Sequence, residues 1–236
     1  MRLDKKLVIL QLYPTRAKAV AAIKSGLVLV NGVSATKPSQ DVSDLDNIVA
    51  GDLPYSTGRG SLKLVAALDA FDVNPSGLVC LDVGASTGGF TEVLLNRGAS
   101  CVIAVDVGSN QLISDIKNDS RVLSFEQTDI RNMRPLRPVD LIVVDVSFIS
   151  LRNIIDALIA WRAPRIITLI KPQFEVPRNI AARANGVIKN ESDRKNAIDN
   201  VVNEFEKKGY NQSGIIESPI HGGSGNTEYL AYFIRQ

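Results

Sequence analysis

The sequence predicts an α/β protein in which a mostly parallel, seven-stranded, doubly wound sheet follows a small α+β module. Two observations predict the sheet. Short apolar runs alternate with stretches of helical periodicity beyond residue 60, and a glycine-rich turn directly follows the first of these runs. A third observation sets the smaller module apart, because the first 40 residues are strongly basic and the rest of the chain is not.

In the N-terminal module, apolar residues recur at helical spacing over residues 3–10 and again over 17–23, after Pro14-Thr15. Gly26 ends the second of these helices. Residues 28–33, Val-Leu-Val-Asn-Gly-Val, predict a strand, an Asn-Gly turn and a returning strand. Two short helices that lead into a hairpin make a compact module.

The net charge of +2 is unevenly distributed along the chain. Residues 1–40 hold seven Lys or Arg against Asp4 alone, which gives +6, so the remaining 196 residues carry −4. A basic head on a slightly acidic body is typical of a nucleic-acid-binding appendage. A solvated helix face is an equally good explanation of the charge by itself.

The boundary between the two parts is predicted from composition. Residues 41–52 are acidic and turn-rich, and residues 54–60, Pro-Tyr-Ser-Thr-Gly-Arg-Gly, have the composition of a linker. We therefore expect an N-terminal domain at 1–52, a linker at 53–60 and a C-terminal domain at 61–236.

The C-terminal domain is expected to begin with a helix, followed by strands and helices in alternation. The predicted strands are 78–83, 101–105, 122–125, 141–144, 165–170, 212–216 and 229–235. Helical periodicity is clearest over 91–97, 151–161 and 194–208. The last strand closely follows a loop of Gly and Ser, and we expect it to insert antiparallel into the sheet.

Composition also limits the class of protein. A chain of 236 residues with 45% hydrophobic and 22% charged residues suffices for one large domain and a small one. No apolar run would span a bilayer and no signal-peptide core follows the N-terminus, so we expect a cytoplasmic location. Cys80 and Cys101 lie in apolar runs without CxxC spacing, which predicts reduced core residues, and no metal site is expected.

The glycine-rich turn predicts a site for a nucleoside. Residues 82–90, Asp-Val-Gly-Ala-Ser-Thr-Gly-Gly-Phe, link a strand to a helix and would bring backbone N–H groups close to a ligand. Asp106, at the tip of the second strand, can accept both hydroxyls of a ribose. The GxSxGG spacing is not the pyrophosphate-binding GxGxxG, so S-adenosylmethionine, which has no phosphates, fits best. The alternative is that the glycines serve only as turns.

Four polar residues are unusually placed for a structural role. Asp145 and Lys171 each follow an apolar run, at the carboxyl end of a parallel strand, where open α/β sheets bind ligands. Lys63 lies one turn into the helix before the sheet, and Glu228 opens the final strand. Each of them alone is explained by a surface charge or a structural ion pair, whereas four at one rim predict an active site.

At the N-terminus, the segments 15–18 and 23–32 resemble the S4 RNA-binding domain, although an unrelated small domain is the alternative. In that family the second helix and the hairpin form a basic surface for structured RNA. The resemblance implies that Arg16, Lys18, Lys24 and Asn31 face RNA, with Arg2 and Lys5 as further candidates.

The residues Lys63, Asp145, Lys171 and Glu228 resemble the Lys–Asp–Lys–Glu tetrad of the FtsJ-like 2′-O-methyltransferases. The whole chain resembles the TlyA family of S-adenosylmethionine-dependent rRNA 2′-O-methyltransferases, some of which are labelled haemolysins. The segments that match are 59–64, 82–90, 104–108, 144–150, 169–175 and 225–230. Ser61 departs from the family, which usually has a second glycine after Arg59-Gly60.

The resemblance implies a Rossmann-like methyltransferase domain and assigns roles within it. Lys171 would contact the ribose 2′-hydroxyl, either as a neutral base or as a cation that stabilises the developing alkoxide. Asp145 would orient Lys171 near the methyl group of the cofactor, while Lys63 and Glu228 would hold the ribose and the charge network. Ribosomal RNA within ribosomal subunits is the implied partner; neither the modified nucleotide nor the oligomeric state is indicated.

The implied cofactor residues surround the glycine-rich turn. The methionine part would be held by Asp82, Gly84, Ser86, Thr87, Gly88, Gly89 and Phe90, the ribose by Asp106, and the adenine by Asp129, for which a helix cap is the alternative. Phe148 and Phe174 flank the crevice and can stack on a nucleotide, although core packing is the commoner role for phenylalanine.

Three other functions compete with this one. A ribosome-assembly factor with an inactive methyltransferase fold would not need an intact tetrad. A membrane-active haemolysin would need a spanning or strongly amphipathic basic helix, and the sequence shows neither. A base methyltransferase usually has an N/D-P-P-Y/F motif or a catalytic Cys, where this chain has Asp145-Val-Ser-Phe.

Overall fold

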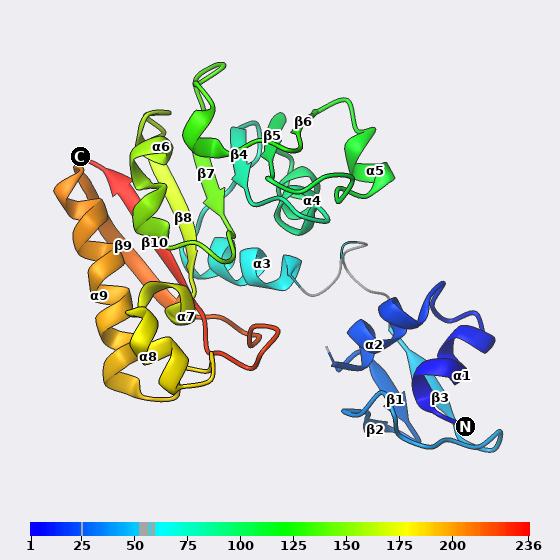
Figure 1. The fold of residues 1–236 in the computed structure, drawn as a ribbon. Coiled ribbons are helices and arrows are strands. Elements are labelled where there is room, and N and C mark those ends of the chain that lie inside the picture. The colour runs from blue at the N-terminus through cyan, green and yellow to red at the C-terminus, as the bar shows by residue number, and fades with distance from the viewer. Residues whose placement is uncertain (25, 52–56, 58–59) are drawn as a thin grey trace. The chain divides into compact units, whose positions relative to one another are not determined.

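The computed structural model describes residues 1–24, 26–51, 57 and 60–236. These residues belong to two compact units, Met1–Arg59 and Gly60–Gln236, and each has its own hydrophobic core (Figure 1). Most of the predicted linker, 53–60, lies outside the described residues, so its conformation stays a prediction.

In the N-terminal unit, two helices and a three-stranded antiparallel sheet share one core. In chain order the elements are α1 (Leu3–Ile9), α2 (Arg16–Lys24), β1 (Val28–Val30), β2 (Val33–Ser34) and β3 (Ile48–Ala50). The predicted helices and hairpin are confirmed, and φ is positive at both turn residues, Asn31 (52°) and Gly32 (79°). The sequence does not predict β3, because this strand is only three residues long and depends on pairing with the free edge of β1.

A buried carboxylate ties the two helices of this unit together. Asp4 of α1 is fully buried and accepts hydrogen bonds from Arg2 at 3.0 Å and from Arg16, the first residue of α2, at 2.7 Å. The two guanidinium groups hold the pKa of Asp4 well below its usual range, and the hydrogen bond from Arg2 is the largest cause.

The C-terminal unit is built on a seven-stranded sheet with the order β6-β5-β4-β7-β8-β10-β9. The strands are β4 (Val79–Val83), β5 (Cys101–Val105), β6 (Val122–Phe125), β7 (Leu141–Val144), β8 (Arg165–Ile170), β9 (Tyr210–Glu217) and β10 (Tyr229–Arg235). All of them run parallel except β10, which is antiparallel to both β8 and β9. The predicted mostly parallel sheet and its antiparallel last strand are therefore confirmed. The strand order turns back between β4 and β7, and ligands bind beyond the carboxyl ends of strands at such a point.

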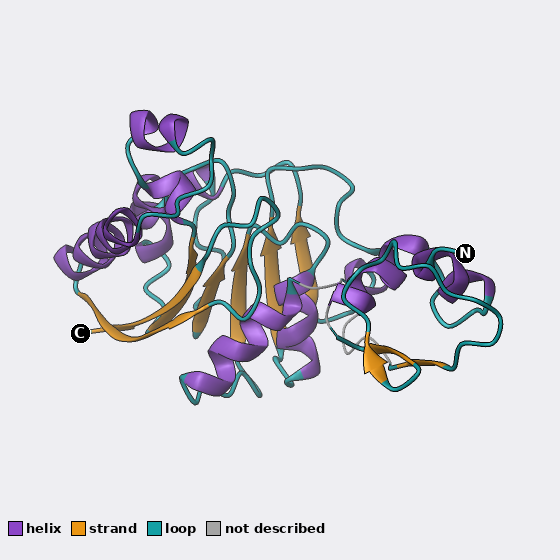
Figure 2. Ribbon diagram, turned by 90° about the horizontal axis from the view of Figure 1, so that it is seen from below, coloured by secondary structure: helices purple, strands orange, loops and turns teal. Residues whose placement is uncertain are grey.

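Helices cover both faces of this sheet (Figure 2). They are α3 (Ser61–Ala70), α4 (Gly89–Asn96), α5 (Ser114–Lys117), α6 (Ile155–Ile159), α7 (Pro172–Glu175), α8 (Arg178–Arg183) and α9 (Glu191–Lys207), with 3-10 turns η1 (Ile130–Asn132) and η2 (Leu151–Asn153). The helix predicted over 151–161 is divided into η2 and α6. The sequence does not predict α5, α7 and α8, because four to six residues are too few to show a helical period. No helix in the described part of the chain is long and apolar enough to cross a membrane.

Replacing Asp4 with alanine should loosen the N-terminal unit, because two arginines lose a buried acceptor. We expect the opening free energy of α1 and α2 amides to fall by about 1–3 kcal/mol, as measured by hydrogen–deuterium exchange of the full chain at pH 7. Asp44→Ala is the matched control, since that exposed carboxylate pairs with Lys6 at the surface and its loss should change exchange little. Equal effects of the two substitutions would contradict the role given to Asp4.

Candidate active site

Four of the predicted residues meet at the carboxyl edge of the sheet. Asp145 directly follows β7, and Lys171 directly follows the neighbouring strand β8. Glu228 precedes β10, whose first residue pairs with the last residue of the antiparallel β8, so Glu228 lies at the same edge. Lys63 reaches this edge from the first turn of α3.

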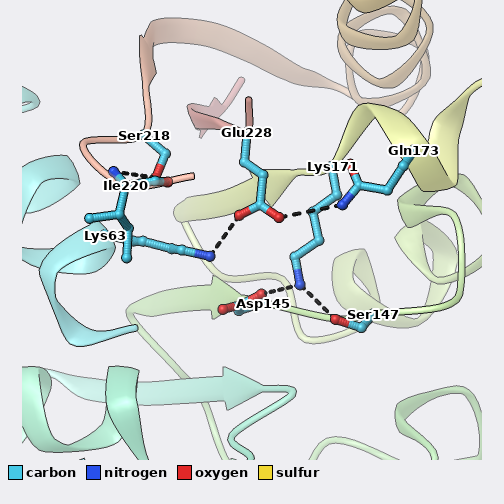
Figure 3. A network of polar contacts seen from close by, with 8 residues as sticks. All are labelled: Lys63, Asp145, Ser147, Lys171, Gln173, Ser218, Ile220 and Glu228. Atoms are coloured by element: carbon cyan, nitrogen blue, oxygen red, sulfur yellow. Dashed lines mark hydrogen bonds and ion pairs between the residues drawn. The ribbon is translucent and has the colours of Figure 1, made fainter. Parts of the chain in front are cut away.

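These four residues form two ion pairs (Figure 3). Lys63 Nζ lies 2.6 Å from Glu228 Oε2, and Lys171 Nζ lies 2.6 Å from Asp145 Oδ1. Lys63, Lys171 and Glu228 are buried, and Asp145 is half-buried. Burying an ammonium group costs free energy unless an opposite charge lies close to it. Each lysine side chain is therefore held beside its carboxylate partner.

Two further residues take part in this network and were missed by sequence reasoning. Lys171 Nζ donates to Ser147 Oγ at 2.7 Å, and Gln173 Nε2 donates to Glu228 Oε1 at 3.4 Å (Figure 3). Ser147 lies two positions after Asp145, and Gln173 two positions after Lys171. This shared spacing was the available sequence clue, because residues close behind a strand end lie near the same edge.

The loop before β10 also approaches the network closely. A Cβ atom on Gly222 would lie 2.4 Å from Glu228 Oε1, which is closer than atoms can approach without displacement. Glycine at this position therefore leaves room for the Glu228 carboxylate. Asn226 is buried and fastens the same loop to residues 186–188, since it accepts from Ile188 N at 2.9 Å and donates to Gly186 O at 2.7 Å.

A cavity of about 490 Å³ adjoins the Lys171–Asp145 pair, because Asp145 and Ser147 form part of its wall. The predicted cofactor residues that line it are Gly84, Ser86, Asp106 and Asp129. Thr87, Gly88, Gly89, Phe90 and Asp82 do not line this cavity. Sequence reasoning missed Gln111 and Arg131, which do line it and which no pattern in the sequence marks.

Gly84 brings the loop after β4 against the segment after β7. Its φ is +86°, and a Cβ atom there would lie 2.4 Å from the backbone oxygen of Asp145. Glycine is required on both counts. The close approach places the glycine-rich turn and Asp145 on the wall of a single cavity.

Two aspartates in the cavity wall are held by local hydrogen bonds. Asp106 accepts from the backbone N of Ser86 at 2.8 Å and of Gly108 at 2.7 Å. Asp129 caps η1, and the side chain of Arg131 pairs with it at 2.5 Å and lowers its pKa. Asp129 is therefore both a helix cap and a cavity residue. Within the described residues, no group of three or more His, Cys, Asp or Glu is placed to hold a metal ion.

The prediction that Phe148 packs in the core is wrong. Its side chain is 90% exposed, and its φ of 66° is a left-handed conformation that bulky residues rarely adopt. The ring lies 5.4 Å from the ring of Phe174, and Phe148 lines the cavity beside Ser147. The turn after β7 therefore directs an aromatic ring into solvent at the cavity.

Known families account for both units of the chain. The S4 domain matches residues 1–48, and the FtsJ-like methyltransferase family matches residues 57–235. The chain is 40% identical over its whole length to the 16S/23S rRNA (cytidine-2′-O)-methyltransferase TlyA of Mycobacterium tuberculosis, covering 90% of that protein. The chain belongs to the TlyA family.

Other relatives carry two kinds of name. The 23S rRNA (cytidine-2′-O)-methyltransferase TlyA of Campylobacter jejuni is 33% identical, with 94% of each chain covered. Hemolysin A of Brachyspira hyodysenteriae is 38% identical, with 99% of this chain and all of that protein covered. The solved structure of a Streptococcus thermophilus protein has a TM-score of 0.77 and is 35% identical to this chain. The match covers all of this chain and 88% of the S. thermophilus chain.

Membership of the TlyA family of FtsJ-like methyltransferases implies S-adenosylmethionine as the methyl donor, and the residues present fit that molecule. Asp106 offers a carboxylate at the cavity wall, where the two hydroxyls of a nucleoside can be bound. Asp82 is fully buried at the end of β4 and accepts from Thr91 Oγ1 at 2.6 Å through Oδ2. Its Oδ1 has no hydrogen-bond partner among the described residues and is a free acceptor.

The residues expected to face RNA lie on α2 and in the hairpin turn. Arg16 is half exposed but pairs with Asp4, and Asn31 donates to Asp46 Oδ1 at 2.8 Å and accepts from Asn47 N at 2.9 Å. Lys18 and Lys24 form no ion pair with any described residue. The two lysines are therefore charges on α2 that no described residue neutralises.

Asp82→Asn should stabilise the protein at alkaline pH and leave its stability at pH 4 nearly unchanged. Burial raises the pKa of Asp82 from 3.8 to about 7, so the folded chain holds this proton more tightly than the unfolded chain does. Stability therefore falls as pH rises from about 4 to 7, and asparagine removes that loss.

We expect the unfolding free energy at pH 8 to rise by about 1–4 kcal/mol in Asp82→Asn, measured by urea denaturation. Asp69→Asn is the matched control, because Asp69 lies at the surface in a pair with Arg97. A difference between wild type and Asp82→Asn that does not vary with pH would contradict the raised pKa.

Proposed function

We propose that this TlyA-family protein transfers a methyl group from S-adenosylmethionine to a ribose 2′-hydroxyl of ribosomal RNA. The observation that carries the proposal is the double placement of Asp145. Its carboxylate pairs with Lys171, and the same residue lines the cavity that four of the predicted cofactor residues line. The lysine assigned to the hydroxyl and the site assigned to the cofactor thus meet at one carboxylate.

The reaction depends on alignment and charge. A ribose hydroxyl is a weak nucleophile near neutral pH, and bound S-adenosylmethionine supplies an activated methyl group. In this proposal Lys171 contacts the hydroxyl oxygen and stabilises the charge that develops on it as the hydroxyl proton passes to solvent, while Asp145 holds Lys171 in place. Holding the hydroxyl in line with the methyl group can lower the barrier by about 7–11 kcal/mol.

In this proposal the buried Lys63–Glu228 pair also holds the ribose, beside the pair of Lys171 and Asp145. Its two charged groups are already paired, and Gln173 donates a further hydrogen bond to Glu228. A preformed arrangement of this kind does not have to reorganise when the substrate arrives, which is how fixed charges stabilise a transition state.

The cofactor contacts follow from the lining of the cavity. Asp106 accepts the ribose hydroxyls of S-adenosylmethionine, and Asp129 accepts from the adenine amino group. The methionine part lies against the loop that holds Gly84 and Ser86. Asp82, Thr87, Gly88, Gly89 and Phe90 do not line the cavity, and their proposed role is to shape this loop.

RNA is proposed to contact the protein in two places. In the N-terminal unit the basic residues Lys18, Lys24 and Arg16 hold phosphates. In the C-terminal unit the exposed ring of Phe148 stacks on the base of the target nucleotide, as aromatic side chains do with unpaired bases. The names of the M. tuberculosis and C. jejuni relatives support ribosomal RNA as the substrate.

Lys171→Ala should abolish methyl transfer while leaving cofactor binding largely intact, because Lys171 does not line the cofactor cavity. We expect at least about a 100-fold loss in the rate of label transfer from S-adenosylmethionine to unmodified ribosomal subunits. Cofactor affinity measured by calorimetry and the unfolding midpoint show whether the variant is intact. Lys207→Ala is the matched control, since that exposed lysine on α9 lies in the surface pair with Glu204.

Near-normal transfer by Lys171→Ala would contradict the role of Lys171. No label on either subunit from the wild-type protein, with the cofactor still bound, would instead favour the ribosome-assembly factor. No binding of the cofactor would contradict the proposal at its first step.

Removing residues 1–52, the N-terminal domain expected from the sequence, should weaken RNA binding and flatten its salt dependence, and point variants test this more sharply in the intact chain. With both Lys18 and Lys24 changed to Ala, we expect the slope of log K against log[salt] to fall by about 1–2, because about two phosphate contacts are lost. The charge-preserving double variant Lys18→Arg, Lys24→Arg is the control and should keep the wild-type slope. An unchanged slope in the alanine variant would remove the case for this surface.

A further inference from the structure

We propose that Ser147 is a positioning residue that fixes the direction of the Lys171 ammonium group. The inference rests on the proposed function and names a residue outside the Lys–Asp–Lys–Glu set. It starts from the hydrogen bond of 2.7 Å from Lys171 Nζ to Ser147 Oγ, beside the ion pair of 2.6 Å to Asp145 Oδ1 (Figure 3).

The geometry of an ammonium group makes the second contact decisive. Nζ bears three hydrogens besides its bond to Cε, and one of them is donated to Ser147 Oγ, whereas the contact of 2.6 Å with Asp145 Oδ1 is an ion pair without hydrogen-bond geometry. The hydrogen bond to Ser147 fixes the rotation of the ammonium group about the Cε–Nζ bond, and with it the directions of the other two hydrogens. With Asp145 alone, the group can turn about that bond, and the direction left for a ribose hydroxyl is not defined. Two anchors reduce that freedom before the substrate arrives.

The charge of Lys171 does not require Ser147. Asp145 already supplies the opposite charge, and a serine hydroxyl is neutral. Among the described residues, Lys171 is the one hydrogen-bond partner of the Ser147 side chain. Ser147 is itself exposed and adds nothing to the core. Its contribution is therefore the orientation of Lys171, and neither packing nor charge balance explains the contact.

The backbone around Ser147 supports the same conclusion. The next residue, Phe148, has the left-handed φ of 66°, a strained conformation that bulky residues rarely adopt. In this strained turn, Ser147 Oγ accepts the hydrogen bond from Lys171, and the ring of the neighbouring Phe148 is exposed. A strained turn at the cavity wall is thus associated with an oriented hydroxyl at the site.

The test compares Ser147→Ala, which removes the hydroxyl, with Ser147→Thr, which keeps it. In the full chain, with saturating S-adenosylmethionine and ribosomal subunits, we expect kcat of Ser147→Ala to fall about 10- to 100-fold. KM for the RNA and Kd for the cofactor should stay within about threefold, because orientation and not binding is lost. Ser147→Thr should recover most of kcat, and Ser213→Ala, an exposed serine on β9, is the matched control.

Four results overturn the inference. They are a wild-type kcat in Ser147→Ala, a loss that threonine does not recover, a loss that accompanies a lower unfolding midpoint, and a loss confined to cofactor affinity. The last would make Ser147 a cofactor contact, which its place in the cavity wall permits.

A second measurement separates this inference from the proposed function. NMR relaxation of the lysine ¹³Cε groups reports the motion of Lys171 without any substrate. We expect Lys171 to become more mobile in Ser147→Ala and to return to wild-type order in Ser147→Thr. Unchanged mobility contradicts the inference even if the protein methylates RNA. Changed mobility supports the inference about Ser147. It does so even if the wild-type protein proves inactive on ribosomal subunits, a result that would disprove the proposed function.

Discussion

Two lysine ammonium groups are buried at the carboxyl edge of the sheet, and the cost of burying them organises the site. Each needs a carboxylate within contact distance. Lys63 meets Glu228, 165 residues further along the chain, and Lys171 meets Asp145 beyond the neighbouring strand. One pair therefore fixes α3 to the start of β10, and the other fixes the end of β8 to the end of β7. Desolvation offsets much of the attraction within such pairs, so net stability is a poor explanation for their presence.

Because of the strand order, the cavity assigned to the cofactor lies on one side of β7 and most of the charged network lies on the other. Gly84, Asp106 and Asp129, which follow β4, β5 and β6, line the cavity assigned to the cofactor. On the other side, β8 and β10 bring Lys171 and Glu228 to the network. The four residues after β7, 145–148, adjoin both. The antiparallel direction of β10 is essential here, because a parallel strand would place its first residue at the opposite edge.

The sequence predicted all seven strands and the three charged residues next to strand ends, Asp145, Lys171 and Glu228, because long apolar runs mark strands and a strand end locates its neighbours. The sequence did not predict contacts between residues that lie far apart along the chain. We could recognise the pairing of β3 with β1 and the hydrogen bonds of Ser147 and Gln173 only once the strands were placed side by side. Phe148 was expected in the core because residue type was the available guide, whereas a left-handed backbone exposes it.

We propose that this edge directs a methyl group to a ribose oxygen, and the most direct test is the position of that methyl group in the RNA. Ribosomal RNA methylated by the protein would be digested to nucleosides, and each methylated nucleoside would be fragmented in a mass spectrometer at the bond between base and sugar. We expect the added mass to stay with the ribose. Added mass on the base would contradict it, whatever the rate of transfer.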